Sequence, residues 1–192
     1  MTEIDVKLRD LKASIADVLP IMKRKVNAYT PVLSFTRVVS DGGAAYFEAT
    51  DRFVAIHSIF ARATEGETFP KFDMFVDVDV LTALKGYGAQ ARVAFDREGF
   101  SVYTDNNRTR FSATIGDDWP NISPLINGPW DDDAYFTPGP NTGKSALNPE
   151  WLKHIKDVRV TPRLNDMAKP WRIEAKDRVK GIVMPARFEV GE

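Results

Sequence analysis

The side chains that could carry acid–base or nucleophilic chemistry are few in this sequence. It contains two histidines, His57 and His154, and no cysteine, which excludes a disulfide framework, a thiolate zinc site and a cysteine nucleophile. Ser58 follows His57 directly, and alternation along a strand sends neighbouring side chains to opposite faces. The carboxylate best placed for His154 is Glu150, four residues before it, and we expect a surface histidine. No nucleophile, base and oxyanion site is assembled, so we expect a protein that is not an enzyme.

Two segments imitate ligand-binding motifs. Residues 139–145 read Gly-Pro-Asn-Thr-Gly-Lys-Ser, but a phosphate-binding loop has four residues between its glycines and a helix that opens at its lysine. The run from Asp131 to Asp133 lacks the interleaved glycine and distant glutamate of a calcium loop. We expect both segments to be solvated loop, and we expect no metal site and no cofactor.

Composition predicts a folded protein with one sizeable core or two modest ones. The chain has 192 residues, of which 43% are hydrophobic and 28% charged, with a net charge of -1. The first five residues carry acid where a signal peptide needs base, and no apolar run approaches the roughly 18 residues of a membrane span. We therefore expect a cytoplasmic protein without membrane contact. A net charge near zero argues against a uniformly basic nucleic-acid binder, but it allows basic residues gathered on one face.

Hydrophobic spacing predicts three successive units, each a short strand, a helix and three strands. In the first unit we expect a strand at 5–8, a helix from 9 to about 22 that Pro20 ends or bends, and strands at 31–39, 45–49 and 53–60. In the second we expect a strand at 72–77, a helix at 80–85 capped by Asp79, and strands at 91–95, 100–104 and 109–115. In the third we expect a stub strand at 135–136, a helix opened by Asn148 and Pro149 and running through Ile155, and strands at 158–164, 171–175 and 179–187. An aromatic-led strand precedes an aspartate turn in each unit, although any meander of hairpins produces aspartate turns at this spacing.

Several motifs occur in an order that resembles the bacterial DNA polymerase III beta subunit family, the sliding clamps. They are Thr30-Pro-Val-Leu33 after the first helix, Glu48-Ala-Thr-Asp51 in a hairpin, Ile115-Gly-Asp-Asp-Trp-Pro-Asn121 before Ser123-Pro124, and Gly181-Ile-Val-Met-Pro-Ala-Arg187 at the end. The last motif resembles the Val-Met-Pro-Met-Arg close of the family. The resemblance implies an α+β sliding-clamp fold of strand-helix-three-strand units, with sheets outside and helices on one face.

The unit count departs from the family. A full clamp subunit has three domains of two units each, whereas this chain has three units in all, so we expect a complete domain at 1–123, a linker at 124–146 and a C-terminal half-domain at 147–192. An unpaired half-domain leaves a sheet edge and an apolar helix face exposed. That predicts either self-association or a small autonomous lobe docked on the first domain. If a ring needs twelve units, four chains supply them, which predicts a homo-oligomer and specifically a tetramer.

The resemblance implies contact with duplex DNA through basic residues on the helices, because clamps meet the phosphate backbone without reading sequence. The candidates are Lys7, Arg9, Lys12, Lys23, Arg24, Lys25, Lys85, Lys153 and Lys156. The alternative is that these are ordinary solubilising residues of amphipathic helices. The run Lys23 to Lys25 is the best candidate, because three consecutive bases in a loop have no structural reason to cluster.

The resemblance also implies a cleft in which short motifs of DNA polymerase and other replication proteins dock. The candidates are Thr50, Asp51, Arg52, Phe53 and Val54 on one side, Val183, Met184, Pro185, Ala186 and Arg187 on the other, and Pro124 between them. The hairpin is about one residue shorter than the family's Thr-Asp-Gly-His-Arg-Leu form and lacks its His-Arg pair, which leaves partner specificity open. Val183 and Met184 at a strand end are also typical of core residues.

These observations predict a DNA replication protein of the sliding-clamp type, a processivity factor that tethers DNA polymerase to duplex DNA without sequence specificity. The alternative is a clamp-like adaptor or competitor that binds replication proteins without encircling DNA. A third, weaker alternative is a nucleic-acid-binding sheet protein unrelated to clamps.

Overall fold

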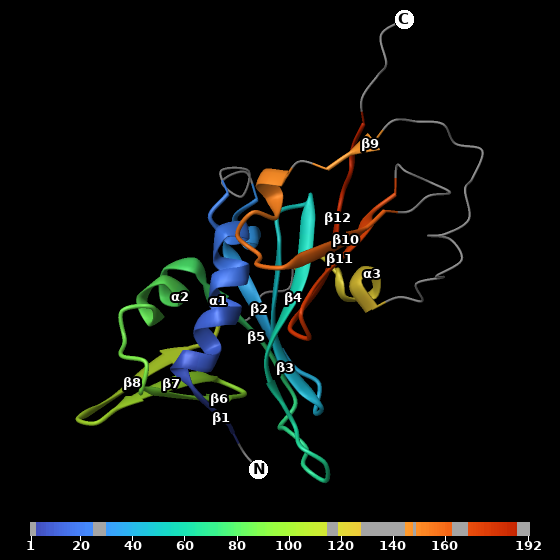
Figure 1. Ribbon diagram of the computed structural model, residues 1–192. Coiled ribbons are helices and arrows are strands. Elements are labelled where there is room, and N and C mark those ends of the chain that lie inside the picture. The colour runs from blue at the N-terminus through green and yellow to red at the C-terminus, as the bar shows by residue number, and fades with distance from the viewer. Residues whose placement is uncertain are drawn as a thin grey trace, which may run out of the picture.

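The computed structural model describes residues 3–24, 30–114, 119–127, 145–147, 149–162 and 169–187. In these parts of the chain the strands form a seven-stranded sheet, a four-stranded sheet and a two-stranded ribbon. The long helix α1 (Leu8–Met22) lies against one face of the large sheet (Figure 1). Of the helices that the structure describes, none is both long and apolar enough to cross a membrane.

The first unit folds largely as its apolar spacing predicts. Leu11, Ile15 and Val18 of α1 are fully buried, and Pro20 lies in the last turn, two residues before the helix ends. A short 3₁₀ helix, Pro31–Ser34, replaces the predicted start of the next strand, because a proline at the first position favours a helical turn. The strands of this unit are β1 (Ile4–Lys7), β2 (Phe35–Ser40), β3 (Ala44–Thr50) and β4 (Val54–Arg62).

The second unit has the predicted elements with one wrong helix cap. The helix α2 (Val78–Leu84) is capped by Asp77, whose carboxylate accepts a hydrogen bond from the Asp79 amide at 2.7 Å. Asp79 therefore lies in the first turn and is not the cap, because the strand before the helix ends at Asp77 and passes directly into it. The strands of this unit are β5 (Phe72–Asp77), β6 (Arg92–Asp96), β7 (Gly99–Thr104) and β8 (Asn107–Ser112).

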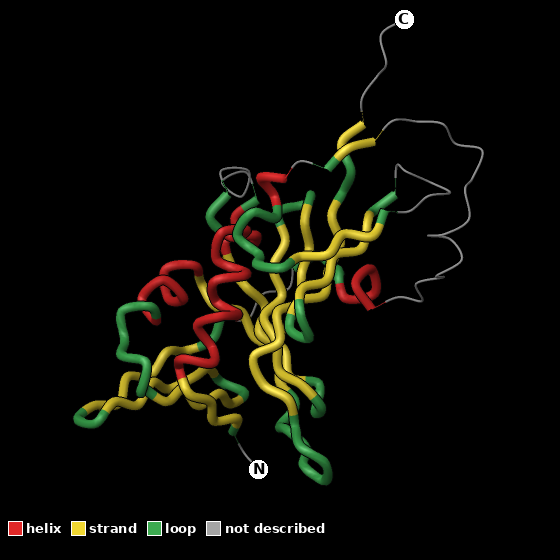
Figure 2. Tube along the Cα trace, in the orientation of Figure 1, coloured by secondary structure: helices red, strands yellow, loops and turns green. Residues whose placement is uncertain are grey.

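The first two units exchange their first strands. β1 pairs antiparallel with β6 of the second unit, and β5 pairs antiparallel with β2 of the first. Each sheet therefore contains strands of both units, and α1 and α2 pack between the sheets (Figure 2). Phe47, Phe95 and Phe100 are buried in the same core cluster as α1, so the two units share one hydrophobic core.

The third unit has its three strands but not the predicted helix. β10 (Val158–Thr161), β11 (Trp171–Ala175) and β12 (Val179–Val183) form an antiparallel meander. The described residues where the helix was expected form only a 3₁₀ turn, Pro149–Trp151, followed by further turns. Leu152 and Ile155 are nevertheless buried, so their spacing indicated contact with the core and not a helix. The expected stub strand at 135–136 lies outside the described residues, and β9 (Ser145–Ala146) pairs with β13 (Ala186–Arg187).

The third unit is joined to the first through a shared sheet. β12 pairs with β4 from Val179↔Ser58 to Val183↔Val54, which makes the large sheet seven-stranded. At Gly181 the two strands approach so closely that a Cβ atom would lie 2.3 Å from the Ala55 carbonyl oxygen. Ile173 and Val179 belong to the same core cluster as α1. An autonomous lobe was therefore the wrong expectation, whereas an edge left open is observed: within the described ranges β10 pairs on one side only.

Candidate functional site

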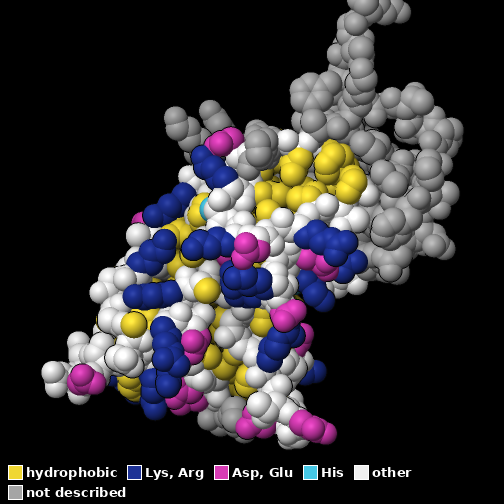
Figure 3. Space-filling model, in the orientation of Figure 1, with side chains coloured by type: hydrophobic (Ala, Val, Ile, Leu, Met, Phe, Trp, Pro, Cys, Tyr) yellow, Lys and Arg dark blue, Asp and Glu magenta, His cyan; other side chains and the backbone are white. Residues whose placement is uncertain are grey.

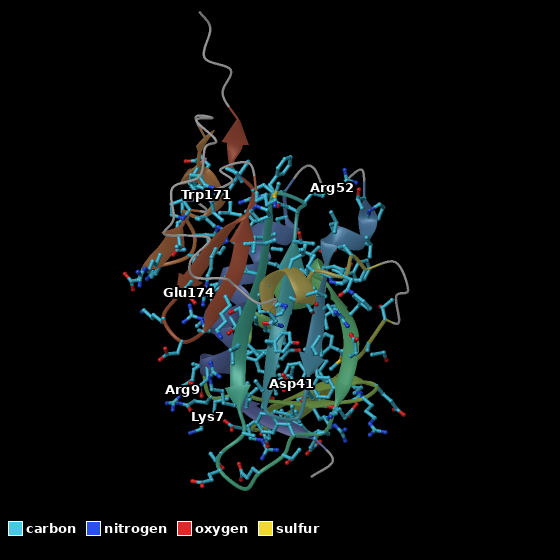
Figure 4. The ribbon with its side chains drawn as sticks, turned by 90° about the vertical axis from the view of Figure 1, so that its right-hand side faces the viewer. Lys7, Arg9, Asp41, Arg52, Trp171 and Glu174 are labelled. Carbon is cyan, nitrogen blue, oxygen red and sulfur yellow. The ribbon has the colours of Figure 1, made fainter. Side chains whose placement is uncertain are left out.

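An apolar groove lies where the third unit joins the first. Its volume is about 300 Å³, and its walls come from the start of β4, the end of β12 and the segment that contains the short helix α3 (Ser123–Asn127). Predicted residues that line it are Thr50, Arg52, Phe53, Val54 and Met184. α3 packs on the outer face of the large sheet, opposite α1. Figure 4 looks onto this face, with Arg52 at its upper end.

The remaining predicted cleft residues lie elsewhere. Asp51 and Val183 are fully buried, Pro185 is buried, and Pro124 is exposed on α3 but outside the lining. Ala186 and Arg187 form β13, and their side chains lie outside the described part of the structure. The predicted hairpin therefore reaches the groove through Arg52, Phe53 and Val54, with Asp51 beneath them.

Asp51 shapes the turn that presents these side chains. Its Oδ1 accepts hydrogen bonds from the Phe53 amide at 2.9 Å and the Val54 amide at 2.7 Å. Arg52 has a φ of 78°, in the left-handed region, and its amide donates to Thr50 Oγ1 at 3.2 Å. Phe53 stays 44% exposed and stacks on Trp151 with ring centroids 5.3 Å apart. The Thr-Asp pair therefore builds a tight turn that holds Arg52 and Phe53 at the groove rim.

The linker side of the groove was missed by sequence reasoning, which named Pro124 alone. Ile122 and Leu125 line the groove, and Leu125 is 54% exposed. The spacing of Ile122, Leu125 and Ile126 is that of an apolar helix face and was a usable signal. The other lining residues that were missed are Thr30, Val32, Leu33, Ala55, Pro120, Pro170 and Ile182.

Lys and Arg side chains gather over α1 and the segments beside it, with Asp and Glu side chains among them (Figure 3). α1 packs on the face of the large sheet opposite α3. Of the predicted DNA contacts, Lys7, Arg9, Lys23, Lys85, Lys153 and Lys156 are exposed. Lys12 is half-buried and its Nζ donates to the Tyr87 carbonyl at 3.0 Å. Lys153 pairs with Glu150 on the surface, and Lys25 lies outside the described residues.

Arg24 has a structural role that the sequence did not reveal. Its guanidinium pairs with the buried Asp51 carboxylate, and its Nη2 donates to the Trp151 carbonyl at 2.7 Å. It thus ties the exit of α1 to the hairpin turn and to the third unit. The premise that the bases at 23–25 have no structural reason to cluster is therefore wrong for Arg24.

The histidines and Ser58 do not form a catalytic group. His57 Nε2 lies 3.0 Å from Glu48 Oε1 on the outer face, whereas Ser58 Oγ donates to Asp17 Oδ2 at 2.7 Å on the inner face. His154 is half-buried, so the expectation of a surface histidine was wrong. Burial and the nearby Arg24 cation hold the pKa of His154 below its ordinary value.

Among the described residues no three His, Asp or Glu side chains form a metal-binding group. The aspartates at 131–133 and the phosphate-loop imitation at 139–144 lie outside those residues.

Similarity to known proteins is found at the level of structure. No family model matches the sequence, and no curated protein matches it. The DNA polymerase III beta subunit of Thermotoga maritima superposes with a TM-score of 0.67 at 12% identity, covering 100% of this chain and 66% of that one. A putative beta subunit from Eubacterium rectale gives a TM-score of 0.70 at 10% identity, covering 98% and 66%. A Pseudomonas aeruginosa sliding clamp bound to griselimycin gives 0.66 at 12% identity, covering 98% and 66%.

These superpositions settle the fold. A sheet protein with another fold is excluded as an alternative, because clamp structures match nearly the whole chain. The match extends over just under two thirds of each clamp subunit. The chain therefore has the α+β fold of the DNA sliding clamps, as its resemblance to the bacterial DNA polymerase III beta subunits implied.

Proposed function

We propose that this protein is a non-enzymatic DNA sliding clamp, a processivity factor that tethers a DNA polymerase to duplex DNA. One observation carries the proposal: within the clamp fold, basic side chains gather on the α1 face while an apolar groove opens on the opposite face of the same sheet. The basic α1 face is suited to binding the DNA backbone, and the apolar groove is suited to binding a polymerase that moves along the DNA with the clamp. The protein acts in the cytoplasm, where it meets the DNA, and it needs no cofactor.

The DNA-facing residues are the exposed bases Lys7, Arg9, Lys23, Lys85, Lys153 and Lys156. Flexible, hydrated ammonium groups suit phosphate contact without base recognition. Lys12 and Arg24 contribute less, because each is half-buried and held by partners within the chain. Lys153 pairs with Glu150, but both side chains are exposed to solvent. Lys25 stays a candidate on its charge alone.

Topology tests the clamp against the adaptor. A clamp stays on nicked circular DNA and is lost when the circle is linearised, whereas an adaptor shows no such difference.

The salt dependence of DNA binding tests the basic residues. Replacing Lys23, Lys153 and Lys156 with Ala lowers the slope of log affinity against log salt by about 0.9 per lost phosphate contact. Lys180→Ala is the control, because Lys180 pairs opposite His57 on the outer face of the sheet. An unchanged slope in the triple variant rejects these three residues as DNA contacts.

The groove receives an extended peptide segment of DNA polymerase or another clamp-motif protein. Its lining is mostly apolar, with Val54, Ile182 and Met184 on one side and Ile122 and Leu125 on the other. Arg52 is exposed at the rim, so an acidic residue beside the apolar anchors of the peptide suits the site. The thioether of Met184 adapts to different anchors.

A fluorescein-labelled decapeptide with adjacent Leu and Phe side chains probes the groove. Leu125→Asp weakens its binding about ten-fold or more, because a charge replaces an apolar contact. Asn127→Asp adds the same charge to the same helix outside the lining and leaves binding unchanged. Griselimycin, which the P. aeruginosa clamp binds, is a second ligand to test against the two variants. Equal affinities in the two variants reject the groove as the peptide site.

The assembly we propose is a homo-oligomer, with four chains supplying the twelve units of a ring. Two strands support this, because β8 and β10 pair on one side only within the described ranges. An edge strand offers unpaired N–H and C=O groups to another chain. β4, the counterpart of β8 in the first unit, is already paired with β12. The adaptor remains the second candidate, because a chain whose edges stay open binds peptides without encircling DNA.

The division into a complete domain at 1–123, a linker at 124–146 and a half-domain at 147–192 is kept as part of this proposal. Strand exchange between the first two units supports the first boundary. The pairing of Val183 with Val54 supports a half-domain that is attached to the first domain through β12.

A further inference from the structure

A carboxylate is fully buried on the outer face of the large sheet, beneath α3. Glu48 Oε1 accepts a hydrogen bond from Ser123 Oγ at 2.9 Å and lies 3.0 Å from His57 Nε2. Glu48 Oε2 accepts from Arg37 Nη1 at 3.0 Å. These three partners come from α3, β4 and β2, so one side chain connects three elements.

Burying a carboxylate is costly unless its partners compensate for the lost hydration. Burial raises the pKa of Glu48, but the hydrogen bonds from His57 and Ser123 and the Arg37 charge outweigh it and hold the pKa below its ordinary value. Arg37 is itself fixed by Asp73 through two bonds of 2.8 and 2.5 Å. The carboxylate is therefore ionised at neutral pH and held in one orientation.

α3 depends on its surroundings for its position. It has five residues, which is too short for an isolated helix to be stable in water. Ile122 and Ile126 pack on Ala55 and Ile182 of the sheet, and apolar packing of this kind has no preferred direction. The bond from Ser123 to Glu48 adds a directional contact between α3 and the sheet.

The same segment forms a wall of the apolar groove. Ile122 precedes Ser123 and Leu125 follows it two residues later, and both line the groove. We infer that Glu48 is a positioning residue, which fixes the α3 wall of the groove through Ser123 and so sets the width that a peptide meets. This inference rests on the proposed peptide-binding function of the groove.

Ser123→Ala is the primary test, because it removes one hydroxyl and leaves the buried ion pair of Glu48 with Arg37 in place. Hydrogen exchange of the Leu125 and Ile126 amides, which donate to the Ile122 carbonyl, reports on α3 without any peptide. We expect exchange of these amides to rise about ten-fold and the labelled decapeptide to bind about five-fold more weakly, as loss of one charge-assisted hydrogen bond predicts. The melting temperature stays close to that of the wild type.

Two variants separate positioning from general destabilisation. Ser123→Thr keeps the hydroxyl and restores both readouts. Asp73→Asn removes the second partner of Arg37 but not the Ser123 bond, and it leaves α3 exchange unchanged. Wild-type exchange and affinity in Ser123→Ala would overturn the inference, as would an equal rise of exchange throughout the sheet. If wild-type protein binds no peptide, the proposed function of the groove fails, while the exchange measurement still decides whether Glu48 positions α3.

Discussion

The first two units and the third unit use the same strand pattern but close it differently. Each of the first two gives its first strand to the other, β1 to β6 and β5 to β2. In the third unit the first strand, β9, is two residues long and pairs with β13 of its own unit. β10 stands where β2 and β6 stand, but in the described structure it receives no crossing strand. Pairing of the last strand of the third unit, β12, with β4 thus attaches this unit to the large sheet, but it leaves β10 as the edge strand of that sheet.

The largest expected effect comes from breaking the junction that holds the third unit. Gly181→Val places a side chain against the Ala55 carbonyl and Ile56, and we expect the free energy of unfolding to fall by about 3 kcal/mol or more. Urea denaturation measures this loss, and hydrogen exchange shows whether β10 to β12 open first. Gly88→Val is the control, because a Cβ there has no neighbour within 4 Å. A stable Gly181→Val protein with protected β12 amides would contradict the close approach.

An ion pair whose carboxylate is buried supplies the next contribution to the junction. Arg178 Nε donates to Asp17 Oδ2 at 2.8 Å and its Nη2 to Asp17 Oδ1 at 3.1 Å, which ties the third unit to α1. This bonding to Asp17 raises the pKa of Arg178. Arg178→Ala leaves the buried carboxylate with Ser58 alone, so we expect a loss of about 2 kcal/mol in chemical denaturation.

The ion pair that serves for comparison lies in the second unit and is partly exposed to solvent. Arg110 bonds Asp96 in a bidentate pair, and both side chains are 32% exposed. Arg110→Ala is expected to cost less than about 1 kcal/mol. If the two variants lose equal stability, the third unit does not depend on its ion pair more than the exchanged units do.

The smallest effect concerns His154, which is half-buried near Arg24 and Asp17 and has a pKa below its ordinary value. In the unfolded chain a histidine titrates near pH 6.5, so the unfolded state binds a proton first as the pH falls. Stability therefore declines below about pH 6.5 until the folded pKa is passed. His154→Gln removes this part of the decline, which urea midpoints at pH 7.5 and 5.5 measure. The same decline in both proteins would assign it to other groups.

Short-range patterns predicted the strands and α1, whereas contacts between distant segments were out of reach. Apolar spacing identified the buried face of α1, because a helix repeats its core contacts every three or four residues. The spacing of Leu152 and Ile155 was read as a helix, yet two buried residues fit a turn equally well. For the groove, the hairpin motif located Arg52 and Phe53, but the wall supplied by Ile122 and Leu125 depends on where the linker folds back. Arg24 was assigned to DNA because it lies in a run of three bases. Its partner Asp51 is twenty-seven residues away, so no local pattern indicates their contact.

The mass of the protein in solution tests most directly whether the unpaired edge of the third unit binds another chain. Sedimentation velocity across a concentration series, with and without nicked circular DNA, is expected to show association that reaches four chains, as a ring of twelve units requires. Inclusion of the Gly181→Val variant shows whether association needs an intact third unit. A monomer at every working concentration, with DNA present or absent, would contradict the assembled clamp.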